Sequence, residues 1–301
     1  MPASLALWRD RRGRVSILRI AVLCLLVTPV VLAAVTILTD GLGARPINNL
    51  IHRAGYWALL FVLITLAVTP LRRIGRFSQV IDVRRMIGVG AFCYAATHIS
   101  LFIADQMFDL TKVATEIALR LYLTIGFTAL LSLAALAATS TDGMVRRLGA
   151  ARWQRLHQLV YVIALLAIVH FFQQTKADVW VPTFVASLFG WLMAYRFVIW
   201  RKRSKGELSA TALLVLTLVV SVLTFAGEAI GIGIAYHVSP LLVLETALDF
   251  DVDMIRPGWL VLGAGLCVVA LDLVRTWQRR PRAAAKPPTV TAEPVREAGS
   301  L

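Results

Sequence analysis

Three histidines lie in long apolar segments, where polar side chains are costly. His98 lies in RRMIGVGAFCYAATHISLFIA, and His157 and His170 lie near the two ends of RWQRLHQLVYVIALLAIVHFF. Ionisable residues inside membrane helices are expensive and commonly mark functional sites. Because neutral imidazole is a common ligand of haem iron, these residues point to a metal-bound cofactor.

The elements that must position these histidines are membrane helices. The chain of 301 residues is 58% hydrophobic and has a mean hydropathy of +0.75, which excludes an ordinary soluble domain. A helix needs about 20 apolar residues to span the hydrocarbon layer. Eight segments are long enough: 17–38, 54–70, 86–105, 117–138, 156–172, 179–200, 210–235 and 257–275. The sequence therefore predicts an all-α, multi-pass membrane protein.

The basic residues predict the orientation of these helices. Of the 31 Lys and Arg residues, only six lie at one set of alternate helix ends: Arg45, Arg53, Lys112, Arg120, Lys176 and Arg256. Because cytoplasmic flanks are enriched in Lys and Arg, both termini are predicted to be cytoplasmic. The basic residues that give the net charge of +14 lie between the apolar segments and reflect this topology, so nucleic acid is not an expected partner.

The opposite side is acidic between the last two spans, where Glu245, Asp249, Asp251 and Asp253 lie. That loop is either simply solvated or a docking surface for a basic partner.

Depth along the helices decides which histidines can pair. At 1.5 Å per residue, His98 lies roughly 18 Å and His170 roughly 21 Å from the cytoplasmic ends of helices that run in the same direction. His157 lies some 15–18 Å from the level of His98. Two axial imidazoles on one metal need nitrogens about 4 Å apart, so His98 pairs with His170. No Cys, Asp or Glu is near enough in sequence to complete a zinc site. A haem with two axial histidines is the best match, and buried hydrogen-bonding histidines are the alternative.

Other polar residues have several interpretations. His157 could ligate a second haem, contact a haem propionate or flavin phosphate, or be a plain interfacial residue. Thirteen residues of ideal helix put it on a different face from His170 unless a bulge or kink lies between them. His52 could bond a propionate or anchor the interface, and His237 is most simply a loop residue. Glu228 is an intramembrane carboxylate and a functional candidate. Cys24, Cys93 and Cys267 lack CxxC spacing and are interpreted as packing residues.

The domain organisation follows from these patterns. We expect a cytoplasmic flank at 1–16, a six-helix cofactor-binding core at 17–200, two further transmembrane helices at 201–275, and a disordered cytoplasmic tail at 276–301, which is rich in Pro, Ala and charge. No Gly-rich nucleotide loop follows a strand anywhere, so no NAD(P)H-binding domain is recognisable.

Residues 45–200 resemble a known family. The motifs are TPLRRIGR, RRMIGV, the TSTDGMVRRLGAARWQRLHQLVY block and YRFVIWR. Together they resemble the haem-binding membrane subunits of bacterial periplasmic methionine-sulfoxide reductase systems, within the wider ferric-reductase-like transmembrane group. The resemblance implies a b-type haem on His98 and His170, with His157 as the third shared histidine and FMN as a further cofactor to consider.

The resemblance also implies partners and a location. Electrons would pass from a cytoplasmic flavin reductase or the quinone pool, across the bacterial inner membrane, to a periplasmic molybdopterin-containing reductase that repairs oxidised methionine. The chain would then be an electron-transfer subunit rather than a complete enzyme. Another ferric-reductase-like electron carrier is one alternative. The other is a transporter or assembly factor, although no internal repeat typical of transporters is evident.

Overall fold

The computed structural model describes residues 7–9, 13–39, 41–175, 178–202 and 208–278. Within these ranges, eight helical stretches are long and apolar enough to cross a membrane, as predicted. They contain α1 (Ile17–Thr39), α2 (Pro46–Ile74), α3 (Arg84–Asp105), α5 (Leu121–Ala138), α8 (Leu159–Gln174), α9 (Trp180–Arg201), α10 (Ala210–Tyr236) and α12 (Pro257–Trp277). The all-α, multi-pass membrane fold is confirmed.

Five short helices were not predicted. They are the 3₁₀ helix η1 (Ser78–Val83) and the α-helices α4 (Leu110–Leu119), α6 (Asp142–Leu148), α7 (Ala150–His157) and α11 (Pro240–Leu248). The span expected at 117–138 therefore starts later, because the chain leaves helical geometry at Arg120. The predicted acidic loop between the last two spans contains α11, which carries Glu245. A search for runs of about 20 apolar residues cannot detect such short elements.

Local signals explain where several helices begin. Pro46 and Pro257 occupy the first positions of α2 and α12, where a missing N–H costs no helical hydrogen bond. The Ser209 hydroxyl accepts a bond from the Ala212 amide at 3.2 Å and so caps α10. The Asp109 carboxylate caps α4 in the same way through the Lys112 amide, at 2.9 Å.

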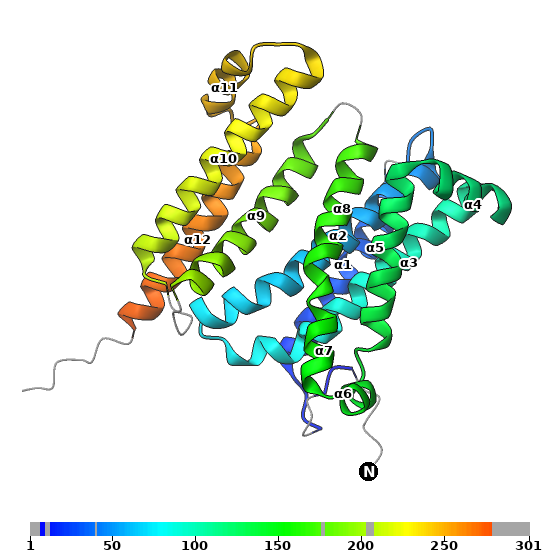
Figure 1. Ribbon diagram of the computed structural model, residues 1–301, viewed down its shortest axis with the longest axis horizontal. Coiled ribbons are helices and arrows are strands. Elements are labelled where there is room, and N and C mark those ends of the chain that lie inside the picture. The colour runs from blue at the N-terminus through cyan, green and yellow to red at the C-terminus, as the bar shows by residue number, and fades with distance from the viewer. Residues whose placement is uncertain (1–6, 10–12, 40, 176–177, 203–207, 279–301) are drawn as a thin grey trace, which may run out of the picture.

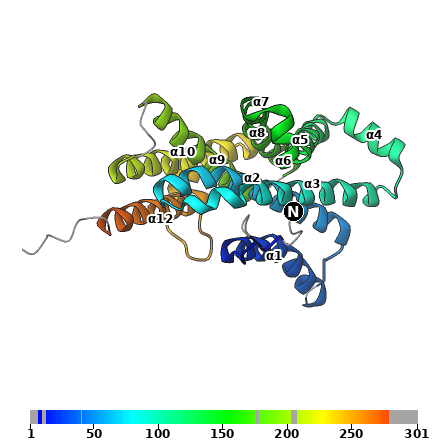
Figure 2. The ribbon, with the colours of Figure 1, turned by 90° about the horizontal axis from the view of Figure 1, so that it is seen from below.

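The helix α2 lies at the centre of the bundle and contacts α3, α8, α9 and α12. It carries much of the core, including the fully buried Phe61 and Leu66. Figure 2 shows α1 on one side of the α2–α3 layer and α5, α7 and α8 on the other. In Figure 1, α10 and α12 lie beside α9, away from α5 and α8. The helices α5 and α8 pair closely, as α10 and α12 do.

Many apolar side chains on the outside of the bundle are exposed, as expected for surfaces that face lipid. Examples are Val30 on α1 and Val222 on α10, which are 60% and 64% exposed. The interpretation of the three cysteines as packing residues is wrong, because Cys24, Cys93 and Cys267 are all free and exposed. Cysteine behaves as a small apolar residue, so a lipid-facing position satisfies it as well as a core position does.

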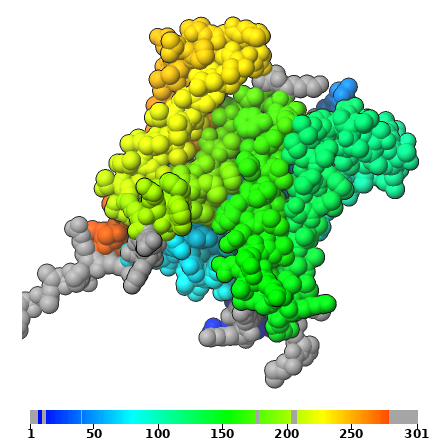
Figure 3. Space-filling model, viewed as in Figure 1, coloured from blue at the N-terminus to red at the C-terminus, as the bar shows by residue number. Residues whose placement is uncertain are grey.

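Short helices mark the two ends of the bundle. Figures 1 and 3 show α4 and α11 toward one end of the molecule, and Figure 1 shows α6 at the other. The predicted N-terminal flank falls partly, and the predicted tail from residue 279 onward, outside the described residues. The start of α2 and the end of α3 lie near α4 and line the first functional site.

Candidate functional site

His98 on α3 and His170 on α8 face each other toward the α4 end of the bundle. Their ring centroids lie 6.2 Å apart, and the ring planes are at 87° to each other. Both side chains are only partly exposed. The similar depths of His98 and His170 along their helices predict that the two side chains can approach each other, and the structure brings them together.

A backbone hydrogen bond fixes each ring of the pair. The Nδ1 atom of His98 lies 2.8 Å from the carbonyl oxygen of Ile51 on α2, and Nδ1 of His170 lies 2.7 Å from that of Tyr122 on α5. A carbonyl can only accept, so Nδ1 must carry the proton in both rings. Each neutral imidazole is then left with its lone pair on Nε2. This tautomer suits metal ligation through Nε2.

A cavity surrounds the two rings, and we call it the histidine-pair cavity. Its volume is about 1410 Å³, its opening included. Apolar side chains from α2, α3, α5 and α8 make most of the wall, as in typical cofactor sites. The polar residues that line it, besides the pair, are Asn48, His52, Tyr56, Asp105, Tyr122 and Gln174. Of these, the sequence had singled out only His52, because single polar residues near the ends of apolar segments carry no distinctive spacing.

His157 lies in a different cavity, toward the α6 end. Its Nδ1 lies 3.0 Å from the Trp153 carbonyl oxygen, and its ring stacks on the Trp153 ring with centroids 3.8 Å apart. Its Nε2 lies 3.4 Å from the Ser140 hydroxyl. The cavity around it, the His157 cavity, has a volume of about 870 Å³, its opening included, and its lining contains Arg84 and Arg85. As the depth argument predicted, His157 does not join the His98–His170 pair.

The helix that carries His157 and His170 is interrupted between them. The helix α7 ends at His157 and α8 begins at Leu159. The Gln158 amide is shared between the Gln154 and Arg155 carbonyls, a tightened turn common at helix ends. The sequence comparison of the two faces applied to an ideal helix without a bulge or kink, and the turn at Gln158 departs from that ideal geometry.

The two cavities follow one another along the same group of helices. Val62 on α2 and Leu133 on α5 line both of them. The two cavities are therefore separated by a thin apolar layer rather than by a whole domain. The arrangement provides two polar centres at different depths in one bundle.

The comparisons with known proteins agree with this architecture. The sequence model of the family described as "Ferric reductase like transmembrane component" matches residues 53–168, which include His98 and His157 and stop two residues before His170. A protein of Herminiimonas arsenicoxydans is 44% identical over 174 residues, which are 56% of this chain and 80% of that protein. A protein of Rhodospirillum rubrum is 42% identical over 199 residues, which are 65% of this chain and 93% of that protein. Both are named protein-methionine-sulfoxide reductase heme-binding subunit MsrQ. This chain belongs to the MsrQ family.

A third MsrQ relative, from Xanthomonas euvesicatoria, is 43% identical over 173 residues, which are 57% of this chain and 78% of that protein. No solved structure matches the chain. The ferric-reductase-like match ends within α8, so α9, α10, α11 and α12 lie outside it.

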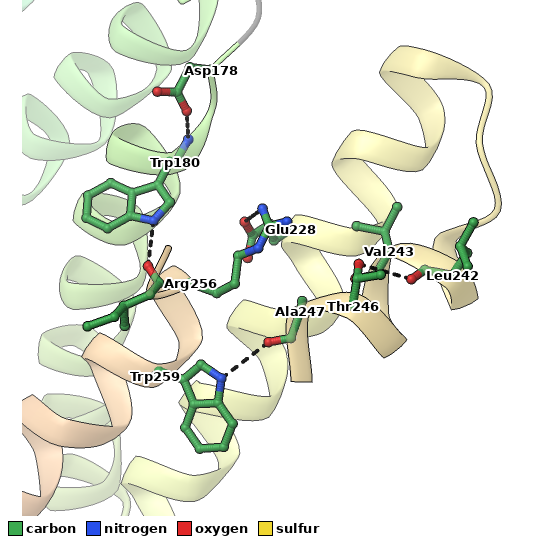
Figure 4. Close-up of polar contacts among 10 residues, drawn as sticks. Asp178, Trp180, Glu228, Leu242, Val243, Thr246, Ala247, Arg256 and Trp259 are labelled. Carbon is green, nitrogen blue, oxygen red and sulfur yellow. Dashed lines mark hydrogen bonds and ion pairs between the residues drawn. The ribbon is translucent and has the colours of Figure 1, made fainter. Parts of the chain in front are cut away.

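Glu228 lies in this region outside the ferric-reductase-like match. Its side chain is buried on α10, and one carboxylate oxygen lies 3.4 Å from Nη1 of Arg256, which precedes α12 (Figure 4). The other oxygen, Oε2, is buried without a hydrogen-bond partner. The indole of Trp180 on α9 donates to the Ile255 carbonyl at 2.8 Å and holds the same segment. Glu228 thus links α10 to the start of α12, and no cavity among those described reaches it.

His237, which follows α10, adopts a left-handed conformation and ends that helix.

Proposed function

We propose that this chain is a membrane electron-transfer subunit that binds a b-type haem between His98 and His170. Its MsrQ relatives are named as heme-binding subunits of a methionine-sulfoxide reductase. The observation that carries the proposal is the geometry of the facing imidazoles.

The spacing of the two rings fits two axial ligands on one metal. With metal–nitrogen bonds of about 2.0 Å and about 1.1 Å from each nitrogen to its ring centroid, such centroids lie about 6 Å apart. The observed separation is 6.2 Å. The Nδ1 bonds to Ile51 and Tyr122 support this assignment, because they leave the Nε2 lone pairs free.

The ligand set fits a haem better than a metal ion held by the protein alone. Among the described residues, no three His, Cys, Asp or Glu side chains form a group that could hold a metal ion. Two histidines on opposite sides of an apolar cavity supply the two axial positions that a porphyrin leaves open. A bound haem supplies a one-electron carrier within the membrane. In such a site α3 and α8 would hold the two ligating histidines, and the apolar lining would keep water away.

The His157 cavity is suited to a negatively charged group. Arg84 and Arg85 line it, with Arg85 also paired to Asp142 at 2.6 Å, and the imidazole of His157 stacks on Trp153 in its wall. These residues can hold a flavin phosphate, as in FMN, or the propionates of a second haem, with His157 as contact or ligand. Either cofactor would place a second redox centre on the α6 side of the apolar layer formed by Val62 and Leu133.

The partners follow from the proposed orientation. We place both termini and the α6 end in the cytoplasm and the α4 end in the periplasm of a bacterial inner membrane. Electrons then enter from a cytoplasmic flavin reductase or the quinone pool through the His157 cavity. They leave through the histidine-pair cavity to a periplasmic molybdopterin-containing methionine-sulfoxide reductase. In this scheme residues 17–200 form the electron-transfer core and residues 201–275 an added two-helix unit.

An optical spectrum of the purified protein tests the proposal. We expect the Soret and α bands of a reducible low-spin b-type haem. His98→Ala and His170→Ala should each lose most of this haem while remaining inserted in the membrane. His237→Ala should retain it, because His237 lines neither cavity. A normal low-spin spectrum in either of the first two variants would refute the ligand assignment. A colourless, folded wild-type protein would instead favour a transporter or assembly factor.

A further inference from the structure

Two glycines occupy equivalent positions beside the two facing histidines. A Cβ atom added at Gly126 on α5 would lie 2.8 Å from Nδ1 and 2.9 Å from Cε1 of His170. One added at Gly55 on α2 would lie 2.9 Å from Nδ1 and 3.1 Å from Cε1 of His98. Carbon atoms that do not bond stay farther apart than this, so each ring lies directly against a backbone that only glycine provides.

Each glycine lies one helical turn after the carbonyl that fixes the ring. Ile51 precedes Gly55 by four residues, and Tyr122 precedes Gly126 by four residues. In an α-helix the carbonyl of residue i points toward residue i+4. A ring that lies against the glycine can therefore reach this carbonyl, as the Nδ1–oxygen distances of 2.8 and 2.7 Å show. A side chain at the glycine would push the ring away from its acceptor.

We infer that Gly55 and Gly126 are positioning residues that set the orientation and basicity of the two axial imidazoles. This inference rests on the proposed haem site. Each glycine and the carbonyl four residues before it form a cradle for one ring. The cradle on α2 consists of Gly55 and the Ile51 carbonyl, and the cradle on α5 consists of Gly126 and the Tyr122 carbonyl. The two cradles hold the ring planes at 87°. The hydrogen bond from Nδ1 also makes Nε2 a stronger donor to the metal.

The perpendicular rings have a spectroscopic consequence. In low-spin ferric haem, perpendicular axial imidazole planes give a strongly anisotropic electron paramagnetic resonance signal, whereas parallel planes give a rhombic one. The cradles therefore predict the strongly anisotropic signal for the wild-type protein. Axial ligands and their hydrogen bonds are among the means by which a protein tunes a haem, so the reduction potential should respond as well.

The test compares three glycine-to-alanine variants of the full chain. Gly126→Ala and Gly55→Ala each place a methyl group against a ring, and the closer approach at Gly126 predicts the larger effect. Gly190→Ala on α9 is the matched control, because an added Cβ there meets nothing within 4 Å. All three changes raise helix propensity equally.

We expect Gly126→Ala and Gly55→Ala to lose haem to apomyoglobin about 10–100-fold faster than the wild type. The haem that remains should show a changed electron paramagnetic resonance signal and a more positive reduction potential. The haem-free variants should have melting temperatures no lower than that of the haem-free Gly190→Ala protein. Wild-type haem release and signal in both variants would overturn the inference. If either variant fails to insert, the electron paramagnetic resonance signal of the wild-type protein decides. A rhombic signal would contradict perpendicular rings and would overturn the inference. A wild type that binds no haem would overturn the proposed function instead.

Discussion

At the scale of single residues, burial and depth explain why two of the three membrane histidines face each other. The sequence placed His98 and His170 at similar depth, because both positions are counted from well-defined basic flanks. It could not predict their hydrogen bonds, because the acceptors at Ile51 and Tyr122 are backbone carbonyls, which every residue has. The role of Gly55 and Gly126 was equally hidden, since glycine is common in membrane helices for other reasons.

His157 differs from the pair in its environment. It stacks on Trp153 and shares its cavity with Arg84 and Arg85, whereas the pair lies in a mostly apolar cavity. Removing its imidazole should therefore leave the ligands of the proposed haem at His98 and His170 intact.

We predict that His157→Ala retains the low-spin spectrum of that haem but is reduced about 10–100-fold more slowly by a cytoplasmic flavin reductase with NADH. Stopped-flow absorbance in membrane vesicles measures the rate. His237→Ala serves as the control and should be reduced at the wild-type rate. Loss of the low-spin spectrum in His157→Ala would show that the pair is not sufficient to hold the haem.

At the scale of helices, hydropathy located all eight spans, but polar ends and short elements were missed. The helix α2 extends from Pro46 to Ile74, well beyond the predicted 54–70, because its ends carry Asn48, Asn49, Arg72 and Arg73. Such residues lower the mean hydropathy of a window without preventing helix formation. The hydrogen bond from α9 to α2 was not predictable either, since its acceptor is a backbone carbonyl.

That carbonyl belongs to Leu66, one turn before Pro70 inside α2. Proline lacks the amide hydrogen that would bond the Leu66 oxygen, and in a membrane the freed group needs another donor. Arg196 on α9 supplies it: its Nη2 atom donates to the Leu66 oxygen at 2.6 Å. The guanidinium also lies 5.5 Å from the ring centroid of Tyr161 on α8. Arg196 thus connects three helices of the core.

We predict that Arg196→Met lowers the free energy of unfolding by about 1–3 kcal/mol, because it leaves the buried Leu66 carbonyl without a partner. In a Pro70→Ala background the alanine amide can bond this carbonyl, so the same substitution should cost much less. Unfolding in mixed detergent micelles measures the double-mutant cycle. Arg201→Met, at an exposed position on α9, is the control. Equal costs in the two backgrounds would mean that the Arg196–Leu66 bond is not the source of the stability.

At the scale of the whole molecule, two cavities at different depths give the bundle a direction. The His157 cavity lies toward α6, where Arg146 and Arg147 lie, and the histidine-pair cavity lies toward α4. The segment after α11, with Asp249, Asp251 and Asp253, is exposed at the end opposite α6. Charge patterning in the sequence supports the cytoplasmic placement of the α6 end, but the arrangement of helices alone is the same for either orientation.

Cysteine labelling distinguishes the two orientations. We predict that Asp251→Cys, in a variant with the three native cysteines replaced by alanine, reacts with a membrane-impermeant maleimide in intact spheroplasts. Gly143→Cys on α6 should react only after the membrane is permeabilised, because the excess of Lys and Arg at that end predicts a cytoplasmic location. Both positions are exposed in the structure, so a failure to react reports on the membrane and not on burial. The cysteine-free parent controls for background, since the native cysteines are themselves exposed on the bundle surface. The reverse pattern would place the histidine pair nearer the cytoplasm and would remove the basis for a periplasmic electron acceptor.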